Sequence, residues 1–161
     1  MLPNDFYTAQ QVKDGEIMAA RQQGVSLYQL MQRAGAAVFG ILRQYYPVPQ
    51  HVLVCCGGGN NGGDGYVLAT LLLKAGIKLT VWSTHQPDRL VGDASLAYLD
   101  YVAAGGVIQT AQDTIEADVD VIIDALLGTG LSGAPKESTA ALIGLINLSS
   151  AQVIAVDIPS G

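Results

Sequence analysis

A glycine-rich segment at residues 57–63, with the sequence GGGNNGG, is the first feature of this chain that could do chemistry. It lies between an apolar run at residues 51–56 and a helical pattern that begins at Asp64. The N-terminus of a helix presents free N–H groups and a partial positive charge to phosphate oxygens, and glycines let a ligand approach the backbone closely. The segment predicts a site for a phosphate-bearing, nucleotide-like ligand, with a ligand-free turn as the alternative.

The surroundings of this loop differ from two familiar nucleotide sites. Residues 57–62 match the pattern G-x-G-x-x-G, but NAD sites of that kind carry an acid at the end of the next strand to hold the ribose. The next predicted strand, at residues 78–83, ends without one. No Gly-Lys-Ser/Thr follows the loop, which excludes a P-loop. The predicted phosphate site therefore has another arrangement.

Two aspartates, Asp124 and Asp157, each end an apolar run and precede a loop rich in glycine or hydroxyl groups. The carboxyl ends of parallel strands meet at one edge of a sheet, where ligands bind. A carboxylate placed there is costly unless it is paired, hydrogen-bonded or bound to a cation. Each aspartate taken alone could equally be a turn residue. Together, the three loops predict one ligand site.

The elements that must position these loops alternate along the chain. Helices are predicted from Thr8 to Gly24, from Ser26 to Pro47, and at residues 64–75, 93–104 and 136–148, and strands at residues 51–56, 78–83, 107–108, 119–124 and 152–156. In the second helix one apolar stripe is expected to hold Leu27, Leu30, Met31, Ala34, Val38, Ile41 and Leu42. Apolar strands alternating with helices predict an α/β fold, a three-layer α-β-α Rossmann-like domain with a mostly parallel sheet and helices on both faces.

The composition limits the classes of function. The 161 residues fit one domain, 50% of them are hydrophobic and the net charge is −6, which argues against general nucleic-acid binding. The N-terminus resembles no signal peptide, and no apolar run is long enough to span a membrane. The adjacent Cys55 and Cys56 are expected to be buried thiols in a reducing, cytoplasmic compartment. His51 and His85 are expected to be incidental surface residues.

Four motifs in order resemble one known family. They are MQRAG at residues 31–35, GNNGGDG at 59–65, DALLGTG at 124–130 and VDIPSG at 156–161. Together they resemble the YjeF N-terminal domain family, the NAD(P)HX epimerases, and the resemblance covers residues 1–161 as one domain. Family members usually continue past the last motif, so the domain is expected to be truncated at its C-terminal end. Larger relatives add an ATP- or ADP-dependent dehydratase domain, which is the expected fused or separate partner.

The resemblance implies an epimerase that interconverts the R and S hydrates of NADH and NADPH, with one potassium ion per subunit. It implies that the ion is bound by Asn61, Asp124 and Ser160. It places around the substrate Asn60, Asn61, Gly62, Gly63, Asp64, Gly128, Thr129, Gly130, Leu131, Ser132, Gly133, Ala134 and Asp157. Some relatives carry a lysine where Ser132 stands here, so a donor at that position would be a hydroxyl or a backbone N–H.

Asp157 is the expected catalytic residue. Epimerisation needs the ring hydroxyl to leave and return on the other face, and a carboxylate beside the ring stabilises the cation formed in between and moves the protons. The alternative function is a non-catalytic nucleotide-binding or dimerisation module of the same fold, and a homodimer is compatible with either function. No nucleic acid or membrane is expected as a partner.

Overall fold

A computed structural model describes residues 7–161 of the chain, and its five strands form one parallel sheet in the order β3-β2-β1-β4-β5. The strands are β1 (Val52–Cys56), β2 (Leu79–Ser83), β3 (Gln109–Thr110), β4 (Val121–Ala125) and β5 (Gln152–Ala155). The helices are α1 (Ala9–Gln23), α2 (Leu27–Tyr45), α3 (Asn60–Lys74), the short η1 (Pro87–Arg89), α4 (Gly92–Ala103) and α5 (Glu137–Leu148). The predicted α/β class and parallel sheet are confirmed.

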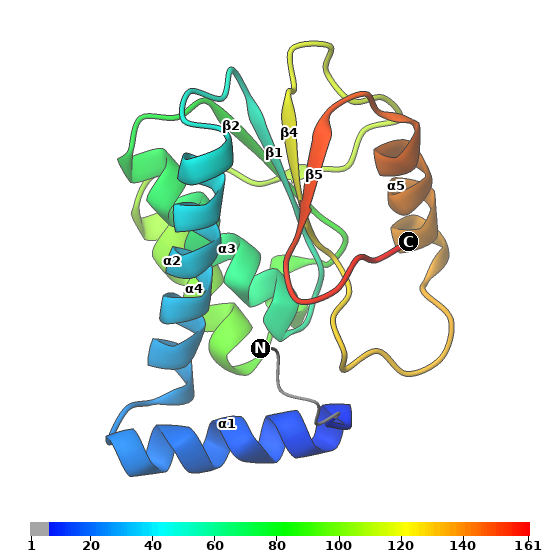
Figure 1. Cartoon of the computed structure of the whole chain (residues 1–161). Helices are drawn as coiled ribbons and strands as arrows, with labels where there is room; N and C mark the ends of the chain where they lie inside the picture. The colour runs from blue at the N-terminus through cyan, green and yellow to red at the C-terminus, as the bar shows by residue number, and fades with distance from the viewer. Residues whose placement is uncertain (1–6) are drawn as a thin grey trace.

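The sheet separates two hydrophobic cores, because successive strand residues point to opposite faces. Helices α2, α3 and α4 cover one face and α5 covers the other (Figure 1). In β1, Cys56 belongs to the core under α3 and Cys55 to the core under α5. Both thiols are free and buried, as the sequence predicted.

The first two helices begin where the sequence predicted. Thr8 and Ser26 each accept a hydrogen bond from the third helical residue and complete a capping box. The apolar stripe predicted for α2 is too wide, since Leu27 and Ile41 are 43% and 47% exposed. The buried positions of α2 are Met31, Gly35 and Leu42. The stripe is narrow because α2 packs on other helices rather than directly on the sheet.

Helix α3 begins at Asn60, four residues before the predicted start at Asp64. Glycine in a helix is unfavourable by its own propensity, so Gly62 and Gly63 indicated a loop. Packing explains why they are helical here. A Cβ on Gly62 would lie 2.0 Å from the Gly57 carbonyl oxygen, and one on Gly63 would lie 2.7 Å from the Met31 side chain. The glycines let the first turn of α3 fit tightly beneath the loop that precedes it.

The edges of the sheet differ from the predictions in two places. β3 lies two residues later than predicted, and β5 is not a buried strand, since Val153 in it is 47% exposed. Among the described residues, β5 pairs only with β4.

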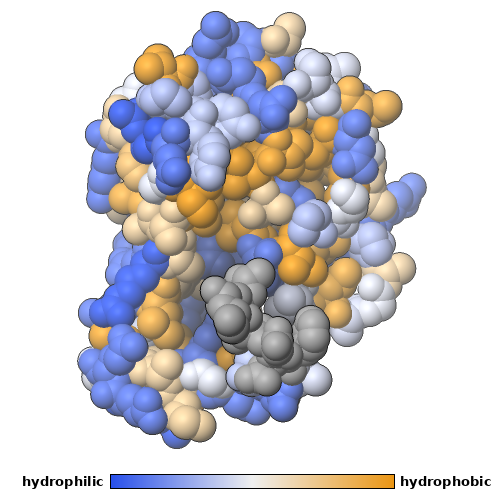
Figure 2. Space-filling model, in the orientation of Figure 1, coloured by the Kyte–Doolittle hydropathy of each residue, from blue (hydrophilic) through white to orange (hydrophobic). Residues whose placement is uncertain are grey.

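Figure 2 shows hydrophobic side chains gathered in the middle of the face that is seen in Figure 1, with hydrophilic surface on the upper part of the molecule and along part of α1. Among residues 7–161, no helix combines the length and apolarity that crossing a membrane requires.

The close fit at the start of α3 predicts a large difference between two glycine-to-alanine changes. Gly62→Ala is expected to lower the free energy of unfolding by about 1–3 kcal/mol, as overpacking of a dense site does. Gly40→Ala, on the exposed side of α2 with no atom near the added Cβ, is the control and is expected to raise it by up to about 1 kcal/mol. Urea unfolding measures both, and equal stability of the Gly62 variant and the wild type would contradict this packing.

Candidate functional site

Three loops meet at the carboxyl edge of the sheet. They follow β1, β4 and β5, which are neighbours in one parallel sheet, and they cover residues 57–59, 126–136 and 156–161. In Figure 1 this edge points downward, toward α1, which crosses below it. The prediction that the three loops share one edge is confirmed, and the side chains that they bring together form the candidate site.

Asn61 joins the first loop to the second. Its amide nitrogen donates a hydrogen bond of 2.8 Å to the carbonyl oxygen of Leu127. That bond fixes the orientation of the amide, so its Oδ1 atom points away from the Leu127 carbonyl group. Oδ1 is buried and has no hydrogen-bond partner among the described residues. A buried amide oxygen without a donor is unfavourable, so this atom is a suitable ligand for a bound cation.

Asp124 and Ser160 join the second loop to the third. Ser160 donates to the Asp124 carboxylate twice, from its backbone N–H at 2.8 Å and from its hydroxyl at 2.7 Å. The same hydroxyl accepts a bond of 3.1 Å from the backbone N–H of Leu127. Asp124 is only 5% exposed, and within residues 7–161 it forms no ion pair with a basic side chain. Within the described part of the chain, hydrogen bonds and no basic side chain therefore hold the buried carboxylate.

Asp157 lies beside this network on the exposed side. Its backbone is left-handed, with φ at +67°, and one carboxylate oxygen accepts bonds from the backbone N–H of Thr129 at 2.7 Å and from its hydroxyl at 3.1 Å. Gly128 separates Asp157 from Asn61, because a Cβ there would lie 2.7 Å from the Asp157 carboxylate and 3.3 Å from the Asn61 Cβ. Only glycine allows the two side chains to come this close.

Asp64, in the second turn of α3, is the fifth polar residue of the site. Burial, followed by the negative charges of Glu16 on α1 and of Asp157, raises its pKa to about 7. A carboxyl group with such a pKa exchanges a proton near neutral pH, as general acids and bases do. Asp64 and Asp157 are therefore two acids in different environments, half-buried and exposed, near enough for the charge of one to act on the other.

The other residues predicted around the substrate take different positions. Gly62 and Gly63 are buried in the packing of α3, whereas Asn60 is exposed at its first turn. The far part of the second loop, consisting of Gly130, Leu131, Ser132, Gly133 and Ala134, is exposed and contributes no side-chain hydrogen bond to the network around Asp124. The structure thus brings together Asn61, Asp64, Asp124, Asp157 and Ser160.

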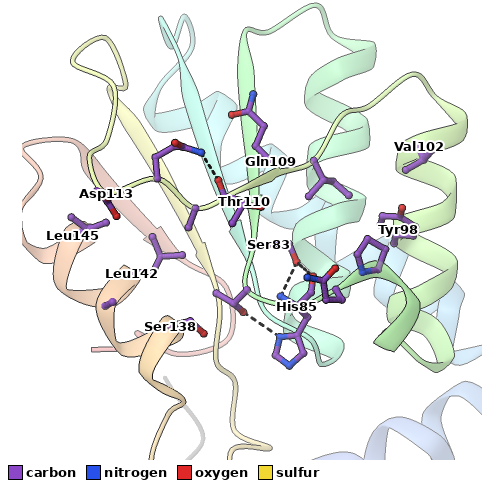
Figure 3. Close-up of a pocket in the computed structure, with 17 residues that line it drawn as sticks. Ser83, His85, Tyr98, Val102, Gln109, Thr110, Asp113, Ser138, Leu142 and Leu145 are labelled. Atoms are coloured by element: carbon purple, nitrogen blue, oxygen red, sulfur yellow. Dashed lines mark hydrogen bonds between the residues drawn. The ribbon is translucent and has the colours of Figure 1, made fainter.

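His85 is a residue that the sequence prediction placed wrongly. It is half-buried and follows the carboxyl end of β2, with its Nδ1 atom 3.2 Å from the Thr84 hydroxyl. Its ring packs on the first loop, since a Cβ on Gly58 would lie 2.4 Å from the ring. Figure 3 shows His85 lining a cavity at this edge. Its place two residues after a predicted strand was the signal that could have found it.

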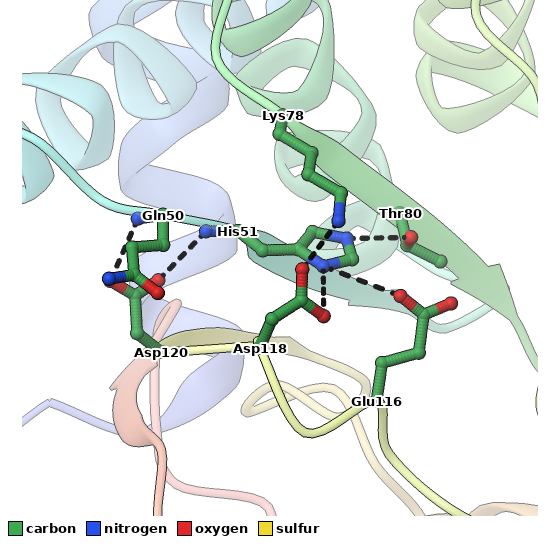
Figure 4. A network of polar contacts seen from close by, with 7 residues as sticks. All are labelled: Gln50, His51, Lys78, Thr80, Glu116, Asp118 and Asp120. Atoms are coloured by element: carbon green, nitrogen blue, oxygen red, sulfur yellow. Dashed lines mark hydrogen bonds and ion pairs between the residues drawn. The ribbon is translucent and has the colours of Figure 1, made fainter.

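His51 is also not a surface residue, being 1% exposed at the start of β1 (Figure 4). It forms with Glu116 and Asp118 the one group of described His, Cys and acidic side chains with metal-like spacing. Its Nε2 atom is 2.9 Å from the Thr80 hydroxyl, and Asp118 pairs with Lys78. The hydrogen bond from Lys78, followed by that from His51, lowers the pKa of Asp118 to about 2. Through these contacts the group connects the amino ends of β1, β2 and β4, at the edge of the sheet opposite the candidate site.

The family model described as YjeF-related protein N-terminus matches residues 27–161. The chain belongs to this family. The match covers all three loops of the candidate site and confirms the family that the four motifs indicated.

The YjeF-related domain is similar to part of several longer proteins. The bifunctional NAD(P)H-hydrate repair enzyme Nnr of Vibrio cholerae is 47% identical over 160 residues, which are 99% of this chain and 32% of the relative. The protein of the same name in Escherichia coli is 45% identical over 160 residues, which are 99% of this chain and 31% of the relative. The chain thus spans about a third of the length of these relatives. The crystal structure of yeast YNL200c shares the fold, with a TM-score of 0.77 at 21% identity over 98% of this chain and 72% of the yeast chain.

The raised pKa of Asp64 predicts how stability depends on pH. Between about pH 4 and pH 7 the folded protein keeps a proton on Asp64 that the unfolded chain has lost, so stability falls as pH rises through this range. Asp64→Asn removes this contribution. Urea unfolding at several pH values measures the effect. From pH 4 to pH 7 the free energy of unfolding of the variant should rise relative to that of the wild type. Parallel curves for the two proteins would contradict the assignment.

Proposed function

We propose that this chain is an epimerase that interconverts the R and S forms of hydrated NADH and NADPH. The observation that carries the proposal is the exposed carboxylate of Asp157 held beside Asn61, in a chain whose relatives are named NAD(P)H-hydrate repair enzymes. A small site with two acids and oriented backbone donors suits a reaction that moves a hydroxyl group and a proton.

The reaction that we propose has two balanced steps. The ring nitrogen of the hydrated nicotinamide pushes out the hydroxyl group, which leaves as water after taking a proton from the acid form of Asp157, and an iminium cation and the Asp157 carboxylate remain. A water molecule then adds to the opposite face and returns its proton to the Asp157 carboxylate. The two bonds from Thr129 leave the second oxygen of Asp157 to face the substrate. Asp64, with its pKa of about 7, is the second candidate for proton transfer.

The residues of the buried network fit a potassium ion, which we propose as the cofactor, one per subunit. Hard cations prefer carboxylate, amide and hydroxyl oxygens, and Asn61, Asp124 and Ser160 offer these three types. Support comes from residues 7–161, in which the Asn61 Oδ1 atom has no hydrogen-bond partner and Asp124 pairs with no basic side chain. A bound cation would supply positive potential for phosphate groups at the start of α3. The chain's own residues carry the proton transfers.

Around this core we propose the remaining contacts of the substrate. They are the exposed Asn60, the backbone of Gly62 and Gly63, and the second loop with Gly128, Thr129, Gly130, Leu131, Ser132, Gly133 and Ala134. An ATP- or ADP-dependent dehydratase, fused or separate, is the proposed partner, because an epimerase is useful to an enzyme that accepts one epimer. We further propose a cytoplasmic location, where NADPH is used, and a homodimer as the assembly.

Removing the titratable charge of Asp157 tests the proposed reaction. Asp157→Asn keeps the shape of the side chain, and the rate of interconversion of the R and S hydrates is expected to fall by about 10²–10⁴-fold, the usual contribution of a general acid and base. Glu116→Gln, a similar change at the opposite edge of the sheet, is the control and should keep the wild-type rate. A wild-type rate in the Asp157 variant would transfer the role to Asp64. No interconversion by the wild type, with nucleotide binding retained, would favour the non-catalytic module.

Exchanging the cation tests the potassium site. Thermal unfolding in potassium chloride and in tetramethylammonium chloride at equal ionic strength should differ, with the higher Tm in potassium, because a ligand of the folded state stabilises it. Asp124→Asn should abolish the difference. Asp120→Asn changes an acid at the start of β4 and should preserve it. Equal melting curves of the wild type in both salts would contradict the site.

A further inference from the structure

A cavity of about 510 Å³ lies at the carboxyl edge of the sheet on the far side of His85 (Figure 3). It opens between α4, which contributes Tyr98 and Val102, and α5, which contributes Leu142 and Leu145. The volume falls within the range of small-ligand sites, about 300–1,000 Å³. None of the residues that line the cavity belongs to the candidate site described above, so the cavity is a separate feature of the same edge.

The first loop links the cavity to the candidate site, because it packs on the His85 ring on one side and on the second loop on the other. Gly58 packs on the His85 ring, and Gly57 packs on the second loop, where a Cβ would lie 2.0 Å from the carbonyl oxygen of Leu126. Asn61 then leads to Leu127 and the buried network. A ligand that crosses the first loop therefore reaches Asp157 at one end and the cavity at the other.

The start of α3 lies between these two ends. Its N-cap is Gly59, and no side chain among the described residues accepts a hydrogen bond from the first N–H groups of the helix. Such a helix start is suited to the oxygens of a pyrophosphate. In a dinucleotide the pyrophosphate stands between two nucleosides, which matches a central helix start flanked by the candidate site and the cavity.

The lining of the cavity suits a nucleoside. The Tyr98 ring and the Leu142 side chain offer flat and apolar contact for a purine, whereas Thr110 and Asp113 offer groups that hydrogen-bond to a ribose or an exocyclic amine.

Two basic residues lie close enough to His85, a lining residue of the cavity, for their charges to act on it. Arg89 ends η1, two residues after the lining residue Pro87, and Lys136 precedes α5, two residues before the lining residue Ser138. Burial lowers the pKa of His85, and the charges of Lys136 and Arg89 lower it further. In a chain with 8 Lys and Arg against 14 Asp and Glu, two basic groups near one histidine give a local positive charge that suits a phosphate.

We propose that this cavity binds the adenosine half of the hydrated dinucleotide, with the pyrophosphate crossing the start of α3 and the nicotinamide half at Asp157. The assignment rests on the proposed function for the identity of the whole substrate. The cavity itself is tested with fragments of the dinucleotide, independently of any turnover.

A tryptophan placed in the cavity tests the proposal. Ala141 lines the cavity from the exposed surface of α5, so Ala141→Trp fills the space without disturbing the core. Ala140, its exposed neighbour, does not line the cavity, and Ala140→Trp is the matched control. Calorimetric titration with 5′-AMP should show at least a tenfold loss of affinity in the Ala141 variant and none in the control. Nicotinamide mononucleotide should bind all three proteins equally.

A second variant guards against a folding defect. Arg89 and Lys136 are both exposed, and changing both to glutamine is expected to weaken 5′-AMP binding several-fold with no effect on nicotinamide mononucleotide. The proposal is overturned if 5′-AMP does not bind the wild type, or if its affinity is the same in the wild type and in the Ala141 variant. Failure of the proposed function is a different result, namely absence of R and S interconversion by the wild type, and leaves the 5′-AMP titration to be judged by itself.

Discussion

The buried carboxylate of Asp124 is the interaction on which the geometry of the site depends. Asp124 lies near the carboxyl end of β4, just before the second loop. Its hydrogen bonds with Ser160 connect the third loop to β4. The Ser160 hydroxyl passes the connection to Leu127, whose carbonyl oxygen holds Asn61 at the start of α3. Three segments distant in sequence are thus fixed by one chain of hydrogen bonds. Burying a carboxylate is costly, so we expect Asp124 to serve the function of the site rather than the stability of the fold.

Close backbone packing is the second constraint, and it acts through glycine. Gly62 lies against the first loop, Gly58 against His85, and Gly128 between Asp157 and Asn61. At each of these positions a side chain would push apart two groups that the site requires together. The polar groups can lie close together at this edge because glycines there add no side chains between them. The opposite edge has a different composition, with His51, Lys78 and Asp118 clamping the strand starts through side-chain contacts.

Much of the fold could be predicted from the sequence, since capping boxes and apolar runs are local signals. The same signals put Asp124 and Asp157 at strand ends, and parallel topology then brought them to one edge. The start of α3 could not be predicted, because the low helix propensity of Gly62 and Gly63 is overridden by packing against Gly57 and Met31, which only the folded chain supplies. The position of His85 after β2 could have been predicted, but the cavity that it lines could not, because α4 and α5 complete that cavity and are distant in sequence.

The most direct test of the central claim is anomalous scattering from a crystal of this protein grown or soaked with thallium(I) or rubidium, which replace potassium. The account predicts one strong anomalous peak among the oxygens of Asn61, Asp124 and Ser160, with the Asn61 Oδ1 atom as a ligand. A crystal that contains the heavy cation but shows no peak at these residues, with Asn61 Oδ1 bonded instead to a protein donor, would contradict it.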